Sequence, residues 1–425
     1  MKHLRLVLIV VTAATFFAAC AGRGVTPVMP SAAVSGASSA AVNAKSSYKL
    51  LYSFKGSPDG ASPLSGLVSF NGTLYGTTLN GSSNYCAMSC GSNGCYLGCG
   101  TVYTIDASGA ESVVYNFNGN FNNAGDGSWP FAGLTALHGL LYGTTAGSGA
   151  HGDGTVFSVS ASGKEKVLHS FSGGSDGQGP EASLIAVRGT LYGTTVYGGS
   201  SGCGGAGCGT VFSITRKGSE RVLYAFQGGN DGYRAFAPLT YLNGKFYGAT
   251  LQGGGTGCGG SGCGTIFELT PSGSESVIAN FGTGTNGAFP NGLTAVNGVL
   301  YGTTEGGGSR NSGTFFSVTP SGNLQFLYSF KDIPDGNLPG ATLLYYKGLF
   351  YGTTVGGGTS GNGTVFSIGK TGTESVLYSF QGGSDGAAPQ APVTAVKSIL
   401  YSTTYKGGGT GCGGYGCGTV FRVKI

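Results

Sequence analysis

Short apolar runs separated by turn residues make up most of this chain. The first set of runs spans 64–70, 74–78, 100–105 and 112–117. Asn71-Gly72 joins the first two runs and predicts a hairpin, because both central residues of a type I′ turn need positive φ. Ser108-Gly109 joins the last two in the same way. The pattern therefore predicts four short antiparallel strands, with no room for a helix between them.

The four-run pattern occurs seven times with a period of about fifty residues. Its second run, Leu-Tyr-Gly-Thr-Thr or a close variant, begins at Leu74, Leu141, Leu191, Phe246, Leu300, Phe350 and Leu400. Its third run, Gly-Thr-(Val/Ile/Phe)-(Phe/Tyr), begins at Gly100, Gly154, Gly209, Gly264, Gly313, Gly363 and Gly418. Four strands in such a period are typical of a β-propeller blade. We therefore predict an all-β, seven-bladed propeller over residues 48–425.

The two ends of the repeat region favour a closed ring over a linear β-solenoid or a string of separate sheets. The region begins with a lone fourth-type strand, 49–54, and ends with a lone third-type strand, 418–423. Pairing these two strands completes the seventh blade and removes the raw edges that a linear array would leave.

Composition supports many short strands and tight turns. Glycines number 86, and charged residues are only 9% of the chain. The formal charge of +5 includes Lys2 and Arg5, so the chain without its leader carries +3. No basic stripe is visible along the sequence, and we do not expect nucleic acid as a partner.

The first 47 residues have the form of an export signal and a tether. Lys2 and Arg5 precede an apolar run at 6–17, and Ala-Ala-Cys ends at Cys20. The segment resembles a bacterial lipoprotein signal at 1–19, with Cys20 as the lipidated residue; ordinary cleavage is the alternative. Residues 20–47, rich in Ala, Ser and Gly, then form a flexible tether with a reach of roughly 30 Å. By the same resemblance, Ala21 after the cysteine favours the outer membrane or cell surface.

The remaining cysteines number ten, which suits an exported domain with disulfides. Three pairs share the form Cys-Gly-Gly-x-Gly-Cys-Gly-Thr: Cys203/Cys208, Cys258/Cys263 and Cys412/Cys417. The first repeat contains Cys86, Cys90, Cys95 and Cys99, whose pairing stays open; a nested Cys86–Cys99 and Cys90–Cys95 arrangement is one option. Zinc is the weaker alternative, because ligands would have to converge from separate blades with almost no histidine.

Two sets of acids also repeat. Asp-Gly turns between blades contain Asp59, Asp126, Asp176, Asp231, Asp335 and Asp385, with Asn286 in the fifth copy. We interpret these as turn residues that accept hydrogen bonds from the backbone; a Ca²⁺-binding ring is the alternative, without an Asp-x-Asp-x-Asp loop to support it. Glutamates begin five of the fourth strands: Glu111, Glu165, Glu220, Glu275 and Glu374. We interpret them as exposed charges that prevent edge pairing.

The repeated motifs resemble the tandem GloVer repeat (Gloeo/Verruco repeat), a family of secreted bacterial proteins with various surface anchors. The resemblance covers residues 48–425 and rests on Leu-Tyr-Gly-Thr-Thr together with Gly-Thr-Val-Phe. It implies an extracytoplasmic, propeller-like domain, and it brings no established activity and no catalytic residues.

Strand direction places the loops between second and third strands, and the loops between blades, on one face, which we call the loop face. Aromatic residues gather in these loops, and we take seven as candidate ligand contacts: Trp129, Phe131, Tyr197, Tyr233, Phe236, Phe289 and Tyr405. Tyr85, Tyr96 and Tyr415 lie in the same loops. Such rings suit sugars or protein partners; packing within their own loops is the equal alternative.

No catalytic motif is present. His151, near Asp153, and the loop charges Glu181, Arg234, Glu305 and Arg310 form no Ser-His-Asp, His-Glu-x-x-His or phosphate-loop pattern. We expect a monomeric, lipid-anchored binding protein with no cofactor and no metal, whose loop face holds an extracellular polymer or protein. A structural or adhesive role and a polysaccharide-acting enzyme are the alternatives.

Overall fold

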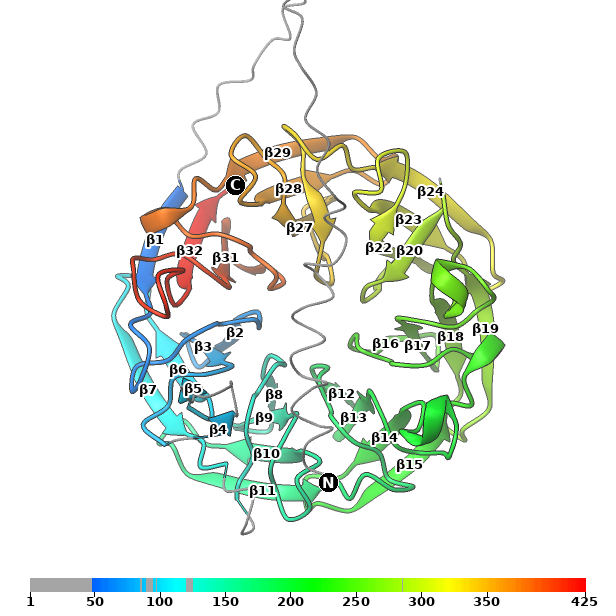
Figure 1. Ribbon diagram of the computed structural model, residues 1–425, viewed down its shortest axis with the longest axis horizontal. Helices are drawn as coiled ribbons and strands as arrows, with labels where there is room; N and C mark the ends of the chain where they lie inside the picture. Colours follow the sequence, from blue (N-terminus) through cyan, green and yellow to red (C-terminus); the bar gives the residue numbers. More distant parts are fainter. Residues whose placement is uncertain (1–47, 85, 89–94, 97, 120–124, 285) are drawn as a thin grey trace, which may run out of the picture. The chain divides into compact units, whose positions relative to one another are not determined.

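Seven antiparallel sheets form a ring in the computed structural model of this protein (Figure 1), which describes residues 48–425 except 85, 89–94, 97, 120–124 and 285. Each sheet is one blade, whose first strand lies nearest the centre and whose fourth strand lies on the rim. The predicted seven-bladed, all-β propeller is therefore confirmed. The signal peptide at 1–19, Cys20 and the tether at 20–47 lie outside the described residues.

The first four blades each contain four strands in sequence order. Their bounds are β2 (Val68–Phe70), β3 (Thr73–Thr78), β6 (Thr101–Ile105) and β7 (Glu111–Asn116) in blade 1; β8 (Thr135–Leu137), β9 (Leu140–Thr145), β10 (Thr155–Val159) and β11 (Glu165–Ser170) in blade 2; β12 (Ile185–Val187), β13 (Thr190–Thr195), β14 (Thr210–Ile214) and β15 (Glu220–Ala225) in blade 3; β16 (Thr240–Leu242), β17 (Lys245–Thr250), β18 (Thr265–Leu269) and β19 (Glu275–Asn280) in blade 4.

The last three blades keep the same order, and blade 7 takes its fourth strand from the N-terminal end. Their bounds are β21 (Thr294–Val296), β22 (Val299–Gly307), β23 (Thr314–Val318) and β24 (Leu324–Ser329) in blade 5; β26 (Leu344–Tyr346), β27 (Leu349–Gly356), β28 (Thr364–Ile368) and β29 (Glu374–Ser379) in blade 6; β30 (Thr394–Val396), β31 (Ile399–Thr404), β32 (Thr419–Lys424) and β1 (Tyr48–Ser53) in blade 7.

A few short elements were not predicted. β20 (Gly287–Pro290) and β25 (Asn337–Pro339) add to blades 5 and 6, because β22 and β27 run on into the loop face. β4 (Ala87–Met88) and β5 (Cys95–Tyr96) pair with each other and belong to a separate unit of the chain. Single 3₁₀ turns occur in the loops: η2 (Cys203–Gly205), η3 (Gly229–Asp231), η4 (Cys258–Gly260) and η5 (Gly383–Asp385).

The predicted hairpin turns are present in six blades. Asn71, His138, Arg188, Asn243, Asn297 and Lys347 have φ of 46–51°, and the glycine after each has φ of 79–89°. The glycine inside Leu-Tyr-Gly-Thr-Thr has a packing reason instead. A Cβ added to Gly76 would lie 2.6 Å from the Tyr103 ring of the same blade. The Tyr103 ring on the next strand therefore leaves no room for a larger residue at Gly76, as the sequence pattern suggested.

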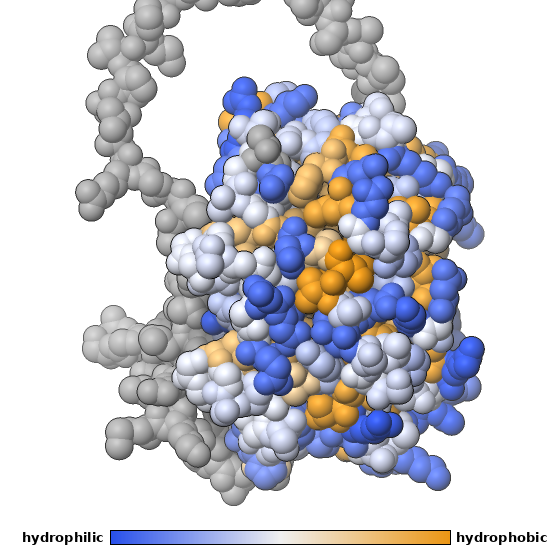
Figure 2. Space-filling model, turned by 90° about the vertical axis from the view of Figure 1, so that its right-hand side faces the viewer, coloured by the Kyte–Doolittle hydropathy of each residue, from blue (hydrophilic) through white to orange (hydrophobic). Residues whose placement is uncertain are grey.

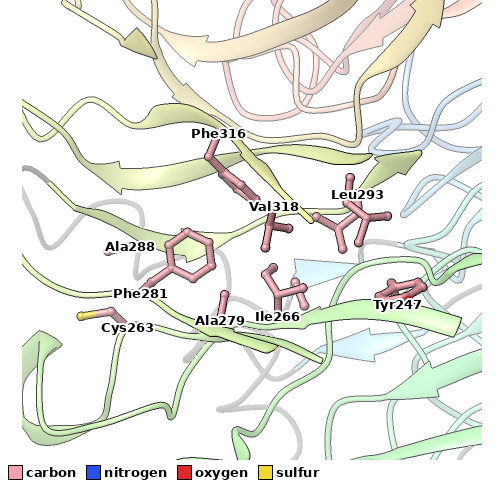
Figure 3. Close-up of a cluster of buried hydrophobic side chains, with 11 residues drawn as sticks. Tyr247, Cys263, Ile266, Ala279, Phe281, Ala288, Leu293, Phe316 and Val318 are labelled. Carbon is pink, nitrogen blue, oxygen red and sulfur yellow. The ribbon is translucent and has the colours of Figure 1, made fainter. Parts of the chain in front are cut away.

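The hydrophobic core lies between neighbouring blades. Seven clusters of buried side chains each combine two adjacent blades. In the cluster between blades 4 and 5, Ile266 and Phe281 of blade 4 face Phe316 and Val318 of blade 5 (Figure 3). Each blade thus buries both faces, which explains its almost continuously apolar strands.

The ring closes through the two ends of the repeat region, as predicted. β1 pairs with β32 from Tyr48 opposite Val423 to Ser53 opposite Thr419. Blade 7 then joins blade 1, because the Thr403 hydroxyl donates to the Pro63 carbonyl at 3.1 Å. A Cβ added to Gly418, whose φ is +94°, would lie 2.5 Å from Pro63 Cδ. All strand pairing that closes the ring lies within residues 48–424.

Four disulfides are present: Cys86–Cys99, Cys203–Cys208, Cys258–Cys263 and Cys412–Cys417. The three predicted pairs and one bond of the nested option are confirmed. Cys90 lies outside the described residues, and the structure does not describe the side chain of Cys95. Disulfides persist in oxidising compartments, so this domain belongs outside the cytoplasm.

The repeated glutamates were wrongly interpreted as exposed edge charges. Each sits half-buried at the start of a rim strand, and one carboxylate oxygen of each is buried without a hydrogen-bond partner. Glu111, for example, interacts with Asp59 and Tyr52 of the interblade loop and rim strand before it. The reason is that rim strands follow one another around the ring (Figure 1), so each start meets the preceding blade's end.

One junction lacks these polar groups. Between blades 4 and 5, the positions of the tyrosine, aspartate and glutamate hold Ala279, Asn286 and Leu324. All three polar side chains are absent together at this junction, whereas the junction between blades 6 and 7 keeps Tyr378 and Asp385 and has Tyr48 at the position of the glutamate. Figure 2 shows the rim on the side of β19 and β24, where apolar patches alternate with polar side chains.

Candidate functional site on the loop face

Every interblade loop is fixed by the same backbone hydrogen bond. In each loop, one residue has a φ of 53–64° and lies directly before the proline that recurs in six of the repeats, or before its counterpart Ala235. The N–H of this residue donates to a carbonyl of the preceding blade's second-to-third loop, at 2.8–3.1 Å. The donors are Ser62, Trp129, Gly179, Arg234, Phe289, Leu338 and Ala388. The loop face is therefore one rigid ring of loops whose side chains differ from blade to blade.

The Asp-Gly turns behave as predicted. Asp59 accepts from the backbone N–H of Lys55 at 2.8 Å, and Asp385 from that of Gln381 at 2.7 Å. Rim-strand tyrosines add a second bond that the sequence did not reveal, such as Tyr52 Oη to Asp59 Oδ1 at 2.6 Å. In blade 2, His169 takes the tyrosine's place, with Nε2 3.2 Å from Asp176 Oδ2.

The seven candidate aromatic residues differ in exposure. Trp129 is 1% exposed, and its indole packs against Gly147, where an added Cβ would lie 2.8 Å from the ring. Tyr197 is 9% exposed. Phe131, Tyr233, Phe289 and Tyr405 are half-buried. Phe236 is exposed at 37%. Phe236 is therefore open to solvent and the four half-buried residues are partly accessible, whereas Trp129 and Tyr197 are buried.

The structure brings one polar cluster together around blade 3: Glu181 lies in the interblade loop before it, Tyr197 in its second-to-third loop, and Arg234 in the interblade loop after it. The Arg234 guanidinium lies over the Tyr197 ring, 5.3 Å from its centroid. Burial raises the pKa of Glu181 to about 7, although Arg234 opposes this shift. Burial alone raises the pKa of Glu305 to about 7 at another point of the face. A carboxyl that titrates near neutrality beside a stacked guanidinium can exchange hydrogen bonds with a polar ligand.

A second cluster lies in blade 7. The Lys406 ammonium lies 5.8 Å from the Tyr405 ring and 5.3 Å from the Tyr415 ring. Tyr415, in the loop closed by Cys412–Cys417, is 72% exposed. Sequence reasoning did not select Lys406, and only its position next to Tyr405 hinted at it. Two rings around one cation form a flat amphipathic surface.

Other candidate groups fall outside these clusters. Tyr85 lies outside the described residues, and the side chain of Tyr96 is not described. Among the residues that the structure describes, no group of three His, Cys, Asp or Glu side chains could hold a metal ion. Within the same ranges, no helix has the length and apolar character needed to cross a membrane.

Comparison with protein families identifies the repeats. The model of the Gloeobacter/Verrucomicrobia repeat matches residues 40–206, 85–296 and 204–421. The chain belongs to this family. The repeat family thus accounts for nearly the whole propeller, as its motifs predicted. No curated protein sequence matches the chain.

Several solved structures are similar to this family member at low identity. The computationally designed Ika8 protein is 13% identical with a TM-score of 0.49, over 88% of this chain and 99% of that chain. The aldose sugar dehydrogenase of Streptomyces coelicolor is 12% identical with a TM-score of 0.43, over 90% and 98%. A gluconolactonase of Xanthomonas campestris is 14% identical with a TM-score of 0.37, over 64% and 78%.

Proposed function

We propose that this protein is a lipid-anchored, extracytoplasmic binding protein whose loop face holds an extracellular glycan. Cys20 is the lipidated residue, and residues 20–47 tether the propeller to the membrane. The form of the leader and the four disulfides support this location. Because sugars have flat apolar faces edged by hydroxyls, aromatic rings with polar neighbours suit them as contacts.

The observation that carries the proposal is the contrast between backbone and side chains on the loop face. The same hydrogen bond fixes all seven interblade loops, whereas their side chains differ. A scaffold that needed only to close a ring would gain nothing from exposed rings such as Phe236 and Tyr415. Rigid positions with variable contents are the usual arrangement of a recognition surface.

The test is a sedimentation screen of the purified protein against insoluble cell-wall and extracellular polysaccharides. For a polymer that retains the protein, the variant with Phe236→Ser, Tyr405→Ser and Tyr415→Ser should bind about two orders of magnitude more weakly, because each ring contributes about 1 kcal/mol to binding. Phe326→Ser is the matched control, since Phe326 is 36% exposed on the rim strand β24, away from the loops.

Two outcomes would overturn the proposal. Equal binding by the loop-face variant and the wild type would remove the aromatic rings from the site. Turnover of a polymer, lost on Glu181→Gln or Glu305→Gln, would replace binding by catalysis, since both carboxyls titrate near neutrality.

A further inference from the structure

The end of the propeller opposite the loop face is built from tight turns, and we call it the turn face. It consists of the turns between first and second strands and those between third and fourth strands, because antiparallel strands reverse at alternate ends. A shallow pocket brings both kinds together, with Gly72 from the first turn and Asp106 from the second turn of blade 1 in its lining. Turns of neighbouring blades also touch: Lys347 Nζ donates to Ser398 Oγ at 2.7 Å.

Charge is divided unequally between the two faces. The loops and strand ends of the loop face contain ten acids and five basic residues. The acids are Asp59, Asp126, Asp153, Asp176, Glu181, Asp231, Glu305, Asp332, Asp335 and Asp385; the basic residues are Lys55, Arg234, Arg310, Lys331 and Lys406. The turns themselves contain one acid, Asp106, and seven basic residues: Lys164, Arg188, Arg216, Lys217, Lys347, Lys370 and Lys397. The strand ends next to the turns add five glutamates, Glu111, Glu165, Glu220, Glu275 and Glu374, and two basic residues, Lys245 and Lys424.

The basic side chains of the turns are available to a partner. All of them except the half-buried Lys370 are exposed. Asp106 keeps its negative charge, but its carboxylate accepts from the backbone N–H groups of Ser108, Gly109 and Ala110 in its own turn and not from a basic side chain. The nearby carboxylate of Glu268 is occupied by Lys245 at 2.5 Å.

The rim-strand glutamates next to the turns cancel only part of this charge at neutral pH. They are half-buried, and burial raises the pKa of Glu165 and Glu220, beside Lys164 and Lys217, to about 7. The groups that face them are acids and their hydrogen-bond partners: Asp126 and Tyr115 for Glu165, and Asp176, which His169 contacts, for Glu220.

The chain also enters the propeller at this end. Rim strands run from the turn face to the loop face, and Tyr48 is the first residue of the rim strand β1. It pairs with Val423, next to the end of β32 at the turn face. The 27 residues between Cys20 and Tyr48 therefore join the propeller at its basic face.

We propose that the turn face docks on the acidic phospholipid headgroups of the membrane that holds the anchor, so that the loop face points away from the bilayer. The proposed lipid at Cys20 supplies the location, and the basic turns supply the orientation. Each Lys or Arg held near an acidic bilayer strengthens binding about fivefold at moderate salt. The attraction acts within about 10 Å, so it needs this face against the surface.

The experiment uses the chain from Ala21 onward, which lacks Cys20 but retains every strand of the closed ring. We expect it to sediment with vesicles of phosphatidylcholine mixed with phosphatidylglycerol, and not with vesicles of phosphatidylcholine alone. Replacing Lys164, Arg216, Lys217 and Lys397 by Gln should weaken binding by about two to three orders of magnitude. The control replaces four exposed loop-face residues, Lys55, Arg310, Lys331 and Lys406, by Gln, and it should bind as the wild type does.

Three results would overturn the proposal: equal loss in both variants, equal binding to both kinds of vesicle, or no binding to acidic vesicles at low salt. Tighter binding to duplex DNA than to acidic vesicles would assign the face to nucleic acid instead. The same turn-face variant is also tested for sedimentation with the polysaccharide, which distinguishes membrane docking by the turn face from polysaccharide binding by the loop face. We expect this variant to lose vesicle binding and to keep polysaccharide binding. If the wild type binds vesicles but no polysaccharide, only the proposed function fails, and the docking proposal is still supported.

Discussion

The stability of the propeller should fall as pH rises through neutrality. Seven glutamates among the described residues have a raised pKa, and five of them begin rim strands, where each packs against the aspartate of the preceding interblade loop. Burial is the main cause, and the neighbouring aspartate adds to it. The pKa rises from an ordinary 4.5 to about 7 for Glu111, Glu165, Glu220 and Glu275, and to about 8 for Glu374.

The sign follows from proton binding. Since the folded pKa lies above the unfolded value, the folded protein holds protons that the unfolded chain has already released. This stability is fully present below pH 4.5 and is lost as pH rises through about 7 to 8. A full shift would correspond to ~3 kcal/mol per glutamate. Because these carboxyls are only half-buried, solvent screening reduces that to ~1 kcal/mol each, or ~5 kcal/mol for the five.

The assay is urea unfolding at pH 5 and at pH 8, on the wild type and on a variant with all five glutamates replaced by Gln. Gln resembles the protonated carboxyl, so the variant should lose most of the pH dependence and exceed the wild type at pH 8. Glu268→Gln is the control: although burial opposes it, hydrogen bonds from Lys245 and Tyr247 lower the pKa of Glu268. The unfolding free energy of that variant should change with pH as much as that of the wild type does. Equal wild-type stability at both pH values would refute the reasoning.

The other predictions concern the fold and its parts. Deleting Lys49–Phe54 removes the partner of β32 and should give a misfolded or aggregating product by light scattering; a monomer with unchanged melting would exclude closure. Peptide mapping without reduction should recover Cys203–Cys208, Cys258–Cys263 and Cys412–Cys417, and reducing one of these short loops should cost about 2 kcal/mol in denaturant unfolding. Gly76→Ala should lower the unfolding free energy by roughly 1–3 kcal/mol, because the added Cβ would clash with the buried Tyr103 ring. An unchanged midpoint of urea unfolding would show that the ring can move. Trp129→Ala should lower the unfolding free energy by roughly 3–5 kcal/mol, because it leaves a cavity. Loss of polysaccharide binding with an unchanged melting temperature would instead place the indole in the binding site.

The repeated motifs made the fold predictable. Hairpin glycines, strand lengths and the two lone end strands are local features, and each recurs often enough that chance cannot explain it. The Asp-Gly turns and the short cysteine pairs were predictable for the same reason, because their partners lie within a few residues.

Features that depend on a neighbouring blade were not predictable. In a single isolated blade the glutamates would be exposed, because the groups that cover them are the aspartate and the tyrosine of the preceding blade. The burial of Trp129 depends on how its loop folds over Gly147. The basic character of the turn face was not predictable because its basic residues, such as Lys164 and Lys397, lie far apart in the sequence. They come to lie on one face only in the folded ring.

We propose that the two faces of the propeller bind different partners at the same time. The most direct measurement loads the protein onto acidic vesicles and then titrates a soluble fluorescent form of the polysaccharide that the screen identifies. We predict that the docked protein binds the polysaccharide as tightly as the free protein does, because the loop face points away from the bilayer. Release from the vesicles by the polysaccharide, or loss of polysaccharide binding on docking, would contradict the account.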